Sequence, residues 1–192
     1  MKALLFNGTL TGTDNLDKLL STALVKDIPI YAIHNTMVLQ PDEYTKMTFL
    51  SPDLTQDEQA HLPVIKEQNH YSLVFILDMN GERLLLTGDM DIASELNILN
   101  DVANIPTLSK GADIIKIAHH GSKTSTSKEW LTGWKAKAAV ISVGINNTYG
   151  HPNPDVIDRI TQQGISIFRT DQQGEIQMKF IQDHVWVRNK IK

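Results

Sequence analysis

The chain contains no cysteine among its 192 residues. Disulfide bonds and thiolate metal sites are therefore excluded, and thiol usage does not indicate a cellular compartment. The sequence also lacks any apolar run near the roughly 18 residues that a membrane-spanning helix needs. The apolar run in residues 1–8 is too short for a signal peptide and is more typical of a strand.

Excess positive charge is absent as well, since the formal net charge is −4. This balance argues against a general nucleic-acid binder. Hydrophobic residues make up 41% of the chain and charged residues 21%, which is ordinary for a soluble globular protein. The sequence has no internal repeat, low-complexity tract or linker, so residues 1–192 are expected to form a single domain.

Short apolar runs alternate with amphipathic segments along the chain. The patterns predict helices at 14–25, 56–61, 92–99, 126–134 and 154–163. They predict strands at 2–6, 28–33, 37–39, 47–50, 71–77, 83–87, 113–118, 138–143, 165–169, 175–181 and 184–188. Asp14 is the expected N-cap of the first helix, and Thr126 with Glu129 has the form of a capping box. Asn80-Gly81 is a strong hairpin signal. This mixture favours an α/β domain with mixed sheets.

Residues 113–127 form the stretch around which the rest is organised. An isoleucine-rich run, typical of a buried strand, stops at His119 and His120 and continues into Gly121 and a series of hydroxyl side chains. Adjacent residues of an extended chain point to opposite sides. We therefore expect only one of the two histidines to face a site.

Three loops that follow predicted strands carry groups able to bind a metal. They contain Asp89, the pair His119 and His120, and His151. In an α/β sheet such loops can converge on one crevice. Carboxylate oxygen and imidazole nitrogen suit zinc or manganese, and a metal hydrolase uses such an ion to lower the pKa of bound water to about 7.

Each of these residues also has a simpler interpretation. Asp89 could be a turn residue or a helix N-cap, His120 a core histidine bonded to backbone, and His151 part of a loop scaffold. Trp130 and Trp134 are more typical of a core than of a base-stacking platform.

The segment after the histidines could bind phosphate at a helix N-terminus, through Ser122, Lys123, Thr124 and Ser125. Residues 110–137 also hold an excess of lysine that would suit an anionic substrate. A solvated face with lysine side chains lying along it is an equally good interpretation.

The chain resembles the C-terminal metallo-β-lactamase-fold domain of the ComEC-like DNA-internalisation competence proteins. The resemblance runs over about residues 2–181. Its carrying motifs are Asn-His-Tyr-Ser-Leu-Val at 69–74, Leu-Leu-Thr-Gly-Asp at 85–89, Asp-Ile-Ile-Lys-Ile-Ala-His-His-Gly-Ser-Lys-Thr-Ser at 113–125, Ala-Val-Ile-Ser-Val-Gly at 139–144, Asn-Thr-Tyr-Gly-His-Pro-Asn-Pro at 147–154, and Phe-Arg-Thr-Asp at 168–171 with Gly174.

The resemblance implies a four-layer αββα sandwich with mixed sheets and a metal site. It implies that Asp89 corresponds to the metal-bridging aspartate, and that His119, His120 and His151 lie near the same ion, zinc or manganese. Asp89 and His120 are the candidate catalytic residues. The activity that the resemblance implies is metal-dependent phosphodiester hydrolysis, with DNA as the partner. The DNA that is degraded is the strand that the cell does not take up.

One departure from the family pattern is large. Metallo-β-lactamase domains carry a His-x-His-x-Asp-His type motif in their first half, and the sequence has none. The chain is therefore expected to be the later part of such a domain, N-terminally truncated, with an incomplete metal site. Its expected partners are the missing N-terminal part and, through uncovered sheet faces, a second copy of itself. The expected location is cytoplasmic for the chain alone, or the extracellular face of a bacterial membrane within a full-length competence protein.

Two other functions remain open from the sequence. Because the metal motif is missing, the chain could be a catalytically inactive remnant or a binding module. A hydrolase of small molecules on the same fold is the third hypothesis, since a fold alone does not fix a substrate.

Overall fold

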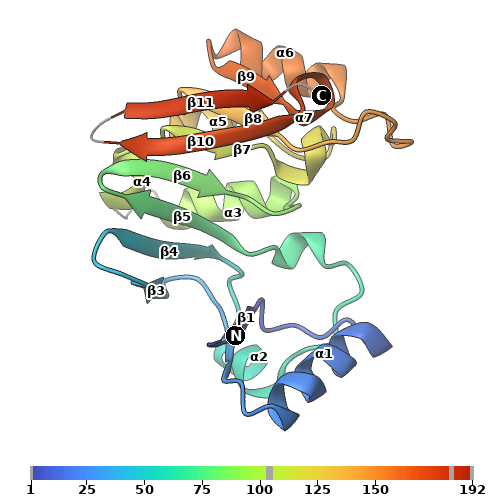
Figure 1. Ribbon diagram of the computed structural model, residues 1–192. Helices are drawn as coiled ribbons and strands as arrows, with labels where there is room; N and C mark the ends of the chain where they lie inside the picture. The colour runs from blue at the N-terminus through green and yellow to red at the C-terminus, as the bar shows by residue number, and fades with distance from the viewer. Residues whose placement is uncertain (1, 103–105, 182–183, 191–192) are drawn as a thin grey trace.

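A mixed sheet of seven strands forms the centre of the computed structural model, which describes residues 2–102, 106–181 and 184–190 (Figure 1). Its strands lie in chain order: β3 (Val38–Leu39), β4 (Thr45–Ser51), β5 (Val74–Met79), β6 (Glu82–Leu86), β7 (Ile114–Lys116), β8 (Ala138–Ile141) and β9 (Ser166–Arg169). The pairs from β3 to β6 are antiparallel, and those from β6 to β9 are parallel. The carboxyl ends of β6, β7, β8 and β9 therefore share one edge.

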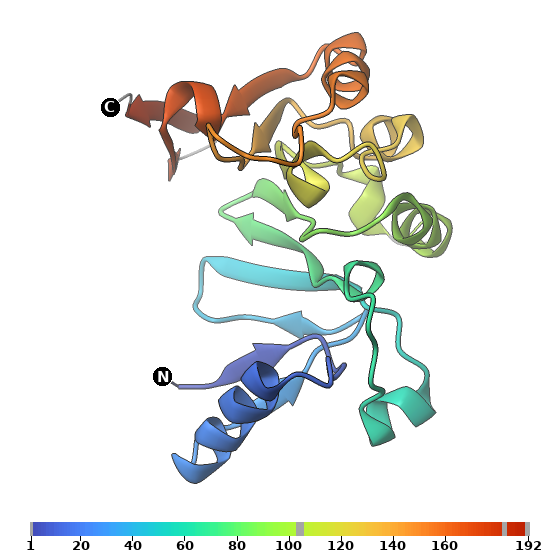
Figure 2. The same ribbon diagram turned by 90° about the vertical axis from the view of Figure 1, so that its right-hand side faces the viewer.

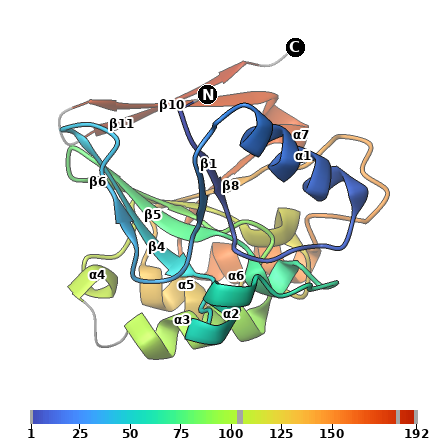
Figure 3. The ribbon, with the colours of Figure 1, turned by 90° about the horizontal axis from the view of Figure 1, so that it is seen from below.

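Helices cover one face of this sheet. They are α3 (Ile92–Val102), α5 (Lys128–Trp134) and α6 (Pro154–Gln162), and Figure 3 shows them along the same side. Strand residues that point towards them, such as Leu85, Ile115 and Ile141, are almost fully buried. Trp130 and Trp134 pack edge to face within this core, with ring centroids 5.5 Å apart, so their predicted core role is confirmed.

A β-hairpin lies on the opposite face of the sheet (Figure 3). It consists of β10 (Glu175–Ile181) and β11 (His184–Lys190), which pair antiparallel. Val185 and Val187 line a cavity of about 330 Å³ together with Ile114 and Phe168 of the sheet. Helices, large sheet and hairpin are thus three successive layers, and the predicted α/β class with mixed sheets is confirmed.

The N-terminal segment is a β-α-β unit beyond the β3–β4 edge of the sheet (Figures 1 and 2). Strands β1 (Leu4–Phe6) and β2 (Ile30–Ala32) pair in parallel, and α1 (Asp14–Val25) connects them. Helix α2 (Gln56–His61) follows β4 and begins with a capping box between Thr55 and Glu58. The short helices η1 (Asn69–Tyr71), α4 (Pro106–Ser109), η2 (Ala118–Gly121) and α7 (Thr170–Gln173) complete the structure. Among the described residues, none of the helices combines the length and the hydropathy that crossing a membrane requires.

Several predicted details are wrong at element ends. Thr13, not Asp14, occupies the N-cap of α1. Ser127 caps α5 by accepting from the backbone N–H of Trp130, whereas Thr126 has a left-handed φ of 61°. The expected capping box is displaced because another side chain, Glu95 of α3, binds the N–H groups of residues 126 and 127. The strand expected at 113–118 is shorter, since β7 ends at Lys116 and η2 follows.

Candidate functional site at the carboxyl edge of the sheet

Four loops meet where the parallel strands end. They follow β6, β7, β8 and β9, and the predicted site residues lie on the first three of them. The carboxyl edge of such a sheet is where loops of an α/β protein build binding sites.

Asp89 lies in the turn between β6 and α3. Gly88 precedes it with a left-handed φ of 55°. A side chain does not fit there, because an added Cβ would lie 2.9 Å from Cβ of Ser72. Ser72 also accepts the Asp89 N–H at 3.1 Å through its hydroxyl, which holds the backbone of the turn. Asp91, rather than Asp89, accepts the N–H of Ser94 at the start of α3. The N-cap interpretation of Asp89 is therefore wrong, and its carboxylate is directed elsewhere.

His119 and His120 do not have the extended conformation expected from the sequence. Both have left-handed backbone, with φ of 46° and 56°, inside the tight turn η2. The expectation that they point to opposite sides is therefore wrong. The ring of His120 approaches Asp89, with Nε2 3.7 Å from Oδ2, while the ring of His119 lies 5.7 Å from that of His151.

The orientation of His120 is set by its second ring nitrogen. Nδ1 lies 2.7 Å from the backbone carbonyl of Ser142, and a carbonyl can only accept, so Nδ1 carries the proton. In the neutral ring this leaves the lone pair of Nε2 on the side of Asp89. The side chain is 45% exposed, which excludes the core-histidine interpretation. Metal-binding histidines typically use this arrangement, with one nitrogen fixed by a carbonyl and the other available.

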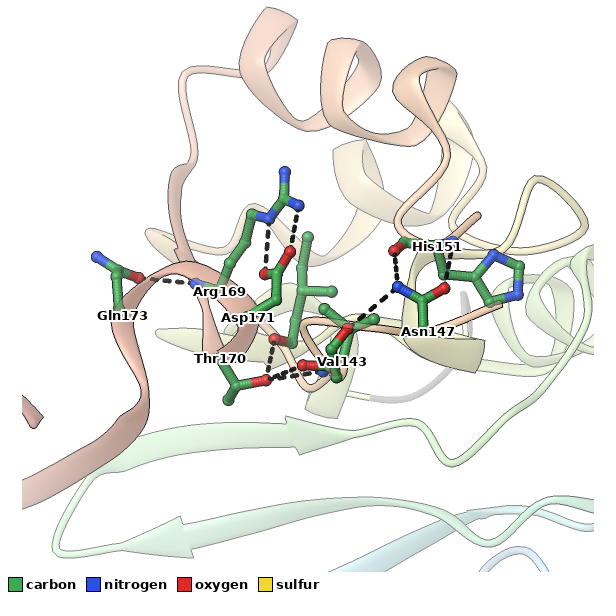
Figure 4. A network of polar contacts seen from close by, with 9 residues as sticks. Val143, Asn147, His151, Arg169, Thr170, Asp171 and Gln173 are labelled. Atoms are coloured by element: carbon green, nitrogen blue, oxygen red, sulfur yellow. Dashed lines mark hydrogen bonds and ion pairs between the residues drawn. The ribbon is translucent and has the colours of Figure 1, made fainter. Parts of the chain in front are cut away.

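His151 is held by the side chain of Asn147 (Figure 4). Asn147 donates to the His151 carbonyl at 2.8 Å and accepts the His151 N–H at 2.9 Å. Burial lowers the pKa of His151 below its usual range, and the nearby rings of His119 and His120 lower it further. These surroundings favour the neutral imidazole, the form that can accept a proton or a cation.

The loops after β7 and β8 pack against each other at Gly121. An added Cβ there would lie only 2.6 Å from Cβ of Pro152, and φ is 83°, so the position requires glycine. The Gly121 carbonyl accepts the N–H of Asn153 at 2.8 Å. This close contact keeps the two histidine loops together.

A cavity of about 450 Å³ opens beside the histidines. Its walls are formed by His120, Ser142, Val143, Gly144, Asn147, Tyr149, His151 and Thr170. Thr170 holds the wall in place, because its hydroxyl accepts the Val143 N–H at 2.7 Å and donates to the Val143 carbonyl at 2.8 Å (Figure 4). Next to it, Arg169 makes two hydrogen bonds to the carboxylate of Asp171, which lowers the pKa of that carboxyl. The cavity is large enough for a small substituent or one unit of a larger substrate.

Two positively charged side chains near the site differ in their surroundings. Lys116 donates to the carbonyls of Gly88 and Ile117 at 3.2 and 3.3 Å, and burial lowers its pKa although Asp89 opposes this shift. Lys123 is exposed on the loop after η2. Lys116 therefore holds the backbone beside Asp89, a role more specific than the lysine excess expected from the sequence.

The hydroxyls proposed to bind phosphate are mostly engaged within their own loop. Ser125 is fully buried and donates to the carbonyls of Ala118 and Ser122. Ser122 is also buried, and its hydroxyl lies 3.0 Å from that of Thr124. Thr124 and Lys123 are the exposed members of the group. Phosphate binding by this segment stays a prediction.

The residues at the site fit a divalent metal in kind but not in number. Two atoms bound to one ion at about 2.1 Å each can be no more than about 4.2 Å apart, so the 3.7 Å between His120 and Asp89 is compatible with a shared ion. However, no group of three or more suitable side chains within the described residues could hold one. Among the described residues, the site therefore offers a pair of suitable donor groups and not a complete metal site.

Comparison with curated proteins places the chain in a family, although no protein-family model matches it. It is 33% identical over 164 residues to ComE operon protein 3 of Bacillus subtilis, covering 85% of this chain and 19% of that protein. It is 29% identical to Recombination protein 2 of Haemophilus influenzae, over 67% of this chain and 15% of that protein. It is 32% identical to Competence protein ComA of Neisseria gonorrhoeae, over 58% of this chain and 16% of that protein.

The chain belongs to the ComEC-like family of competence proteins, as their metallo-β-lactamase-fold domain. It spans less than a fifth of the length of each of these relatives. Among solved structures it is similar to a presumed metal-dependent hydrolase from Parabacteroides distasonis, with a TM-score of 0.46 and 15% identity over 83% of this chain and 62% of that one. It is also similar to CmlA beta-hydroxylase, with a TM-score of 0.47 and 8% identity over 73% of this chain and 32% of that one.

Proposed function

We propose that the chain contributes part of a metal-dependent phosphodiesterase site that hydrolyses DNA, with zinc or manganese as the ion. The observation that carries the proposal is the convergence of Asp89 and His120 from two different loops, at 3.7 Å, with His120 oriented by a backbone carbonyl. His119 and His151 lie beside this pair. A carboxylate and imidazoles gathered at one sheet edge form the donor set of hydrolytic zinc and manganese sites.

The substrate class is proposed from the family. DNA is the substrate that the resemblance to competence proteins implies, and two of the relatives carry competence or recombination in their names. The cavity beside His120 offers polar groups and an exposed tyrosine, which are compatible with a nucleotide. In this proposal Asp89 and His120 contact the reacting phosphodiester or its ion, and Asn147 positions His151.

The remaining metal ligands would come from a polypeptide outside the described residues. The test is to co-express this chain with the part of Bacillus subtilis ComE operon protein 3 that precedes the matched region, and to measure metal content by mass spectrometry. We expect the complex to hold zinc or manganese and to cleave a labelled DNA oligonucleotide, and the Asp89→Asn complex to lose both. Equal metal content and cleavage in the two complexes would contradict the proposal.

A second function is favoured by one observation, the lack of a group of three metal-binding side chains among the described residues. In that case the chain is a binding module on a hydrolase scaffold. A co-expressed complex that binds DNA but holds no metal and cleaves nothing would support this function instead.

A further inference from the structure

The β10–β11 hairpin has two chemically different faces. Ile176, Met178 and Phe180 of β10 are half-buried, and so are Val185 and Val187 of β11, which line the cavity against the sheet. The alternate residues Gln177, Lys179, Trp186 and Arg188 are exposed. Alternation along a strand sends neighbouring side chains to opposite faces, so these four share the outer face.

The strand register places the four outer side chains next to one another. Lys179 lies opposite Trp186, and Gln177 lies opposite Arg188. Trp186 therefore has a cation across the hairpin and a second cation two residues along its own strand. All four, with Met178 and Val187, line a shallow hollow on the hairpin. We call Gln177, Lys179, Trp186 and Arg188 the hairpin strip.

Trp186 is the least expected of these side chains. It is 66% exposed, whereas Trp130 and Trp134 are completely buried in the core. Leaving a large aromatic ring in water gives up the free energy that burying it would contribute. Neither Lys179 nor Arg188 makes an ion pair with another described residue, so both cations remain available to a partner.

We propose that the hairpin strip binds single-stranded DNA, with a base stacked on Trp186 and phosphates contacted by Lys179 and Arg188. An aromatic ring flanked by cations is the combination that proteins use for single strands, because every unpaired base has a π-face and every linkage a negative charge. A duplex would keep its bases stacked on one another, so the ring would find no partner. Lys179 and Arg188 give this face an excess of positive charge over Glu175, which accepts from Gln177, although the chain as a whole is acidic.

The position of the strip suits a role in guiding substrate. Strand β10 begins directly after α7, whose Thr170 lines the cavity beside His120, and Figure 1 shows β10 running away from that end. A single strand lying along the hairpin would thus reach the edge of the candidate site. This inference deepens the proposed function, on which its choice of DNA rests, but it concerns binding and needs no metal.

The test is the binding of a fluorescein-labelled oligothymidylate to the full chain, measured by fluorescence anisotropy in EDTA so that no hydrolysis can occur. We expect Trp186→Ala to weaken binding by roughly five- to 150-fold, the loss expected for the stacking of one base. Trp186→Phe should restore most of the affinity. Lys179→Gln and Arg188→Gln should each reduce the slope of log Kd against log salt by about 0.7.

Matched controls come from exposed residues on other strands. Tyr31→Ala removes a half-exposed aromatic ring on β2, and Lys46→Gln removes an exposed cation on β4. Both should leave the Kd unchanged. Thermal melting of every variant checks that the fold is retained, which is expected because the substituted side chains lie in solvent.

The outcomes separate this inference from the proposed function. Affinity that depends on Trp186, in a protein whose complex cleaves no DNA, would support the strip and contradict the hydrolase. Unchanged affinity in Trp186→Ala and in both charge variants would overturn the strip, whatever the cleavage result. Loss of binding to anionic phospholipid vesicles in Trp186→Ala, with unchanged oligonucleotide binding, would also overturn it, in favour of a membrane surface.

Discussion

Nε2 of His120 lies 3.7 Å from Oδ2 of Asp89, across the two loops that follow β7 and β6. Because Nδ1 of His120 is bonded to the Ser142 carbonyl, the imidazole lone pair and the carboxylate point into the same space. The two side chains are half-exposed, so a cation from solvent can reach both.

This pair predicts where a divalent cation binds first. In a titration with Mn²⁺ followed by NMR, the ring signals of His120 should broaden before those of His34, whose Nδ1 also bonds a backbone carbonyl but which makes no ion pair with a described carboxylate. Asp89→Asn should weaken this binding by at least about tenfold, since even the loss of a residue that only supports a metal ligand typically costs about 10–100-fold. Asp91→Asn is the matched control, since it changes a half-exposed carboxylate two residues away that bonds Ser94. Similar broadening in the wild type and the Asp89 variant would contradict the prediction.

The pKa of His151 gives a second prediction. Burial and the neighbouring rings of His119 and His120 hold this pKa below its unfolded value of about 6.5. For a base with a depressed pKa, the contribution to stability is present above the unfolded pKa and is lost as the pH falls through the folded pKa. Acidification below pH ~6.5 should therefore destabilise the metal-free chain through this residue.

NMR titration of the His151 ring in EDTA measures this effect directly. The midpoint should lie below that of an unfolded peptide, and His119→Gln should raise it, because a neighbouring positive charge is removed. His61→Gln should leave the midpoint where it is. A midpoint of His151 at or above the peptide value would show that the surroundings do not favour the neutral ring.

How much of this site was visible in the sequence can be judged from individual residues. The three loops with Asp89, His119, His120 and His151 were predicted from strand patterns, and their common edge follows from parallel pairing. The left-handed turn at His119 and His120 was not predictable, because non-glycine residues rarely adopt positive φ. The left-handed turn brings the histidine loop against the Gly88 carbonyl, which accepts the His119 N–H.

Contacts between residues distant in the chain were the other part that the sequence did not reveal. Helix α2 was predicted with its correct ends, since its capping box lies within a few residues. The predicted start of α5 was wrong, because the N–H groups of Thr126 and Ser127, just before the helix, bind Glu95, more than thirty residues earlier. The alternation of apolar and polar residues in β10 and β11 can be seen in the sequence. The exposure of Trp186 cannot, because it depends on which face of the hairpin packs against the sheet.

Asn147 provides a third prediction. Its amide bonds both the N–H and the carbonyl of His151, so Asn147→Ala should free this part of the loop (Figure 4). We expect faster hydrogen exchange of the His151 amide and broader ring signals, with a loss of overall stability of only about 1 kcal/mol, as for one or two half-exposed hydrogen bonds. The control is Asn146→Ala, at the exposed neighbouring position. Unchanged exchange at His151 would mean that the loop is held by other contacts.

Glu95 gives the last prediction, because its buried carboxylate binds the backbone N–H groups of Thr126 and Ser127 and so fixes the start of α5 after the histidine loop. Glu95→Ala leaves two buried N–H groups without a partner, and this should reduce the free energy of unfolding by about 2–5 kcal/mol in urea denaturation. Glu67→Ala, at an exposed position, should change the free energy of unfolding by less than about 0.5 kcal/mol.

Burial raises the pKa of Glu95, so the contribution of Glu95 to stability is fully present below the unfolded pKa of about 4.3 and declines as the pH rises through the folded pKa. The difference between wild type and Glu95→Ala should therefore be larger at pH ~5 than at pH ~8. A difference that grows with pH, or a variant as stable as the control, would contradict this role of Glu95.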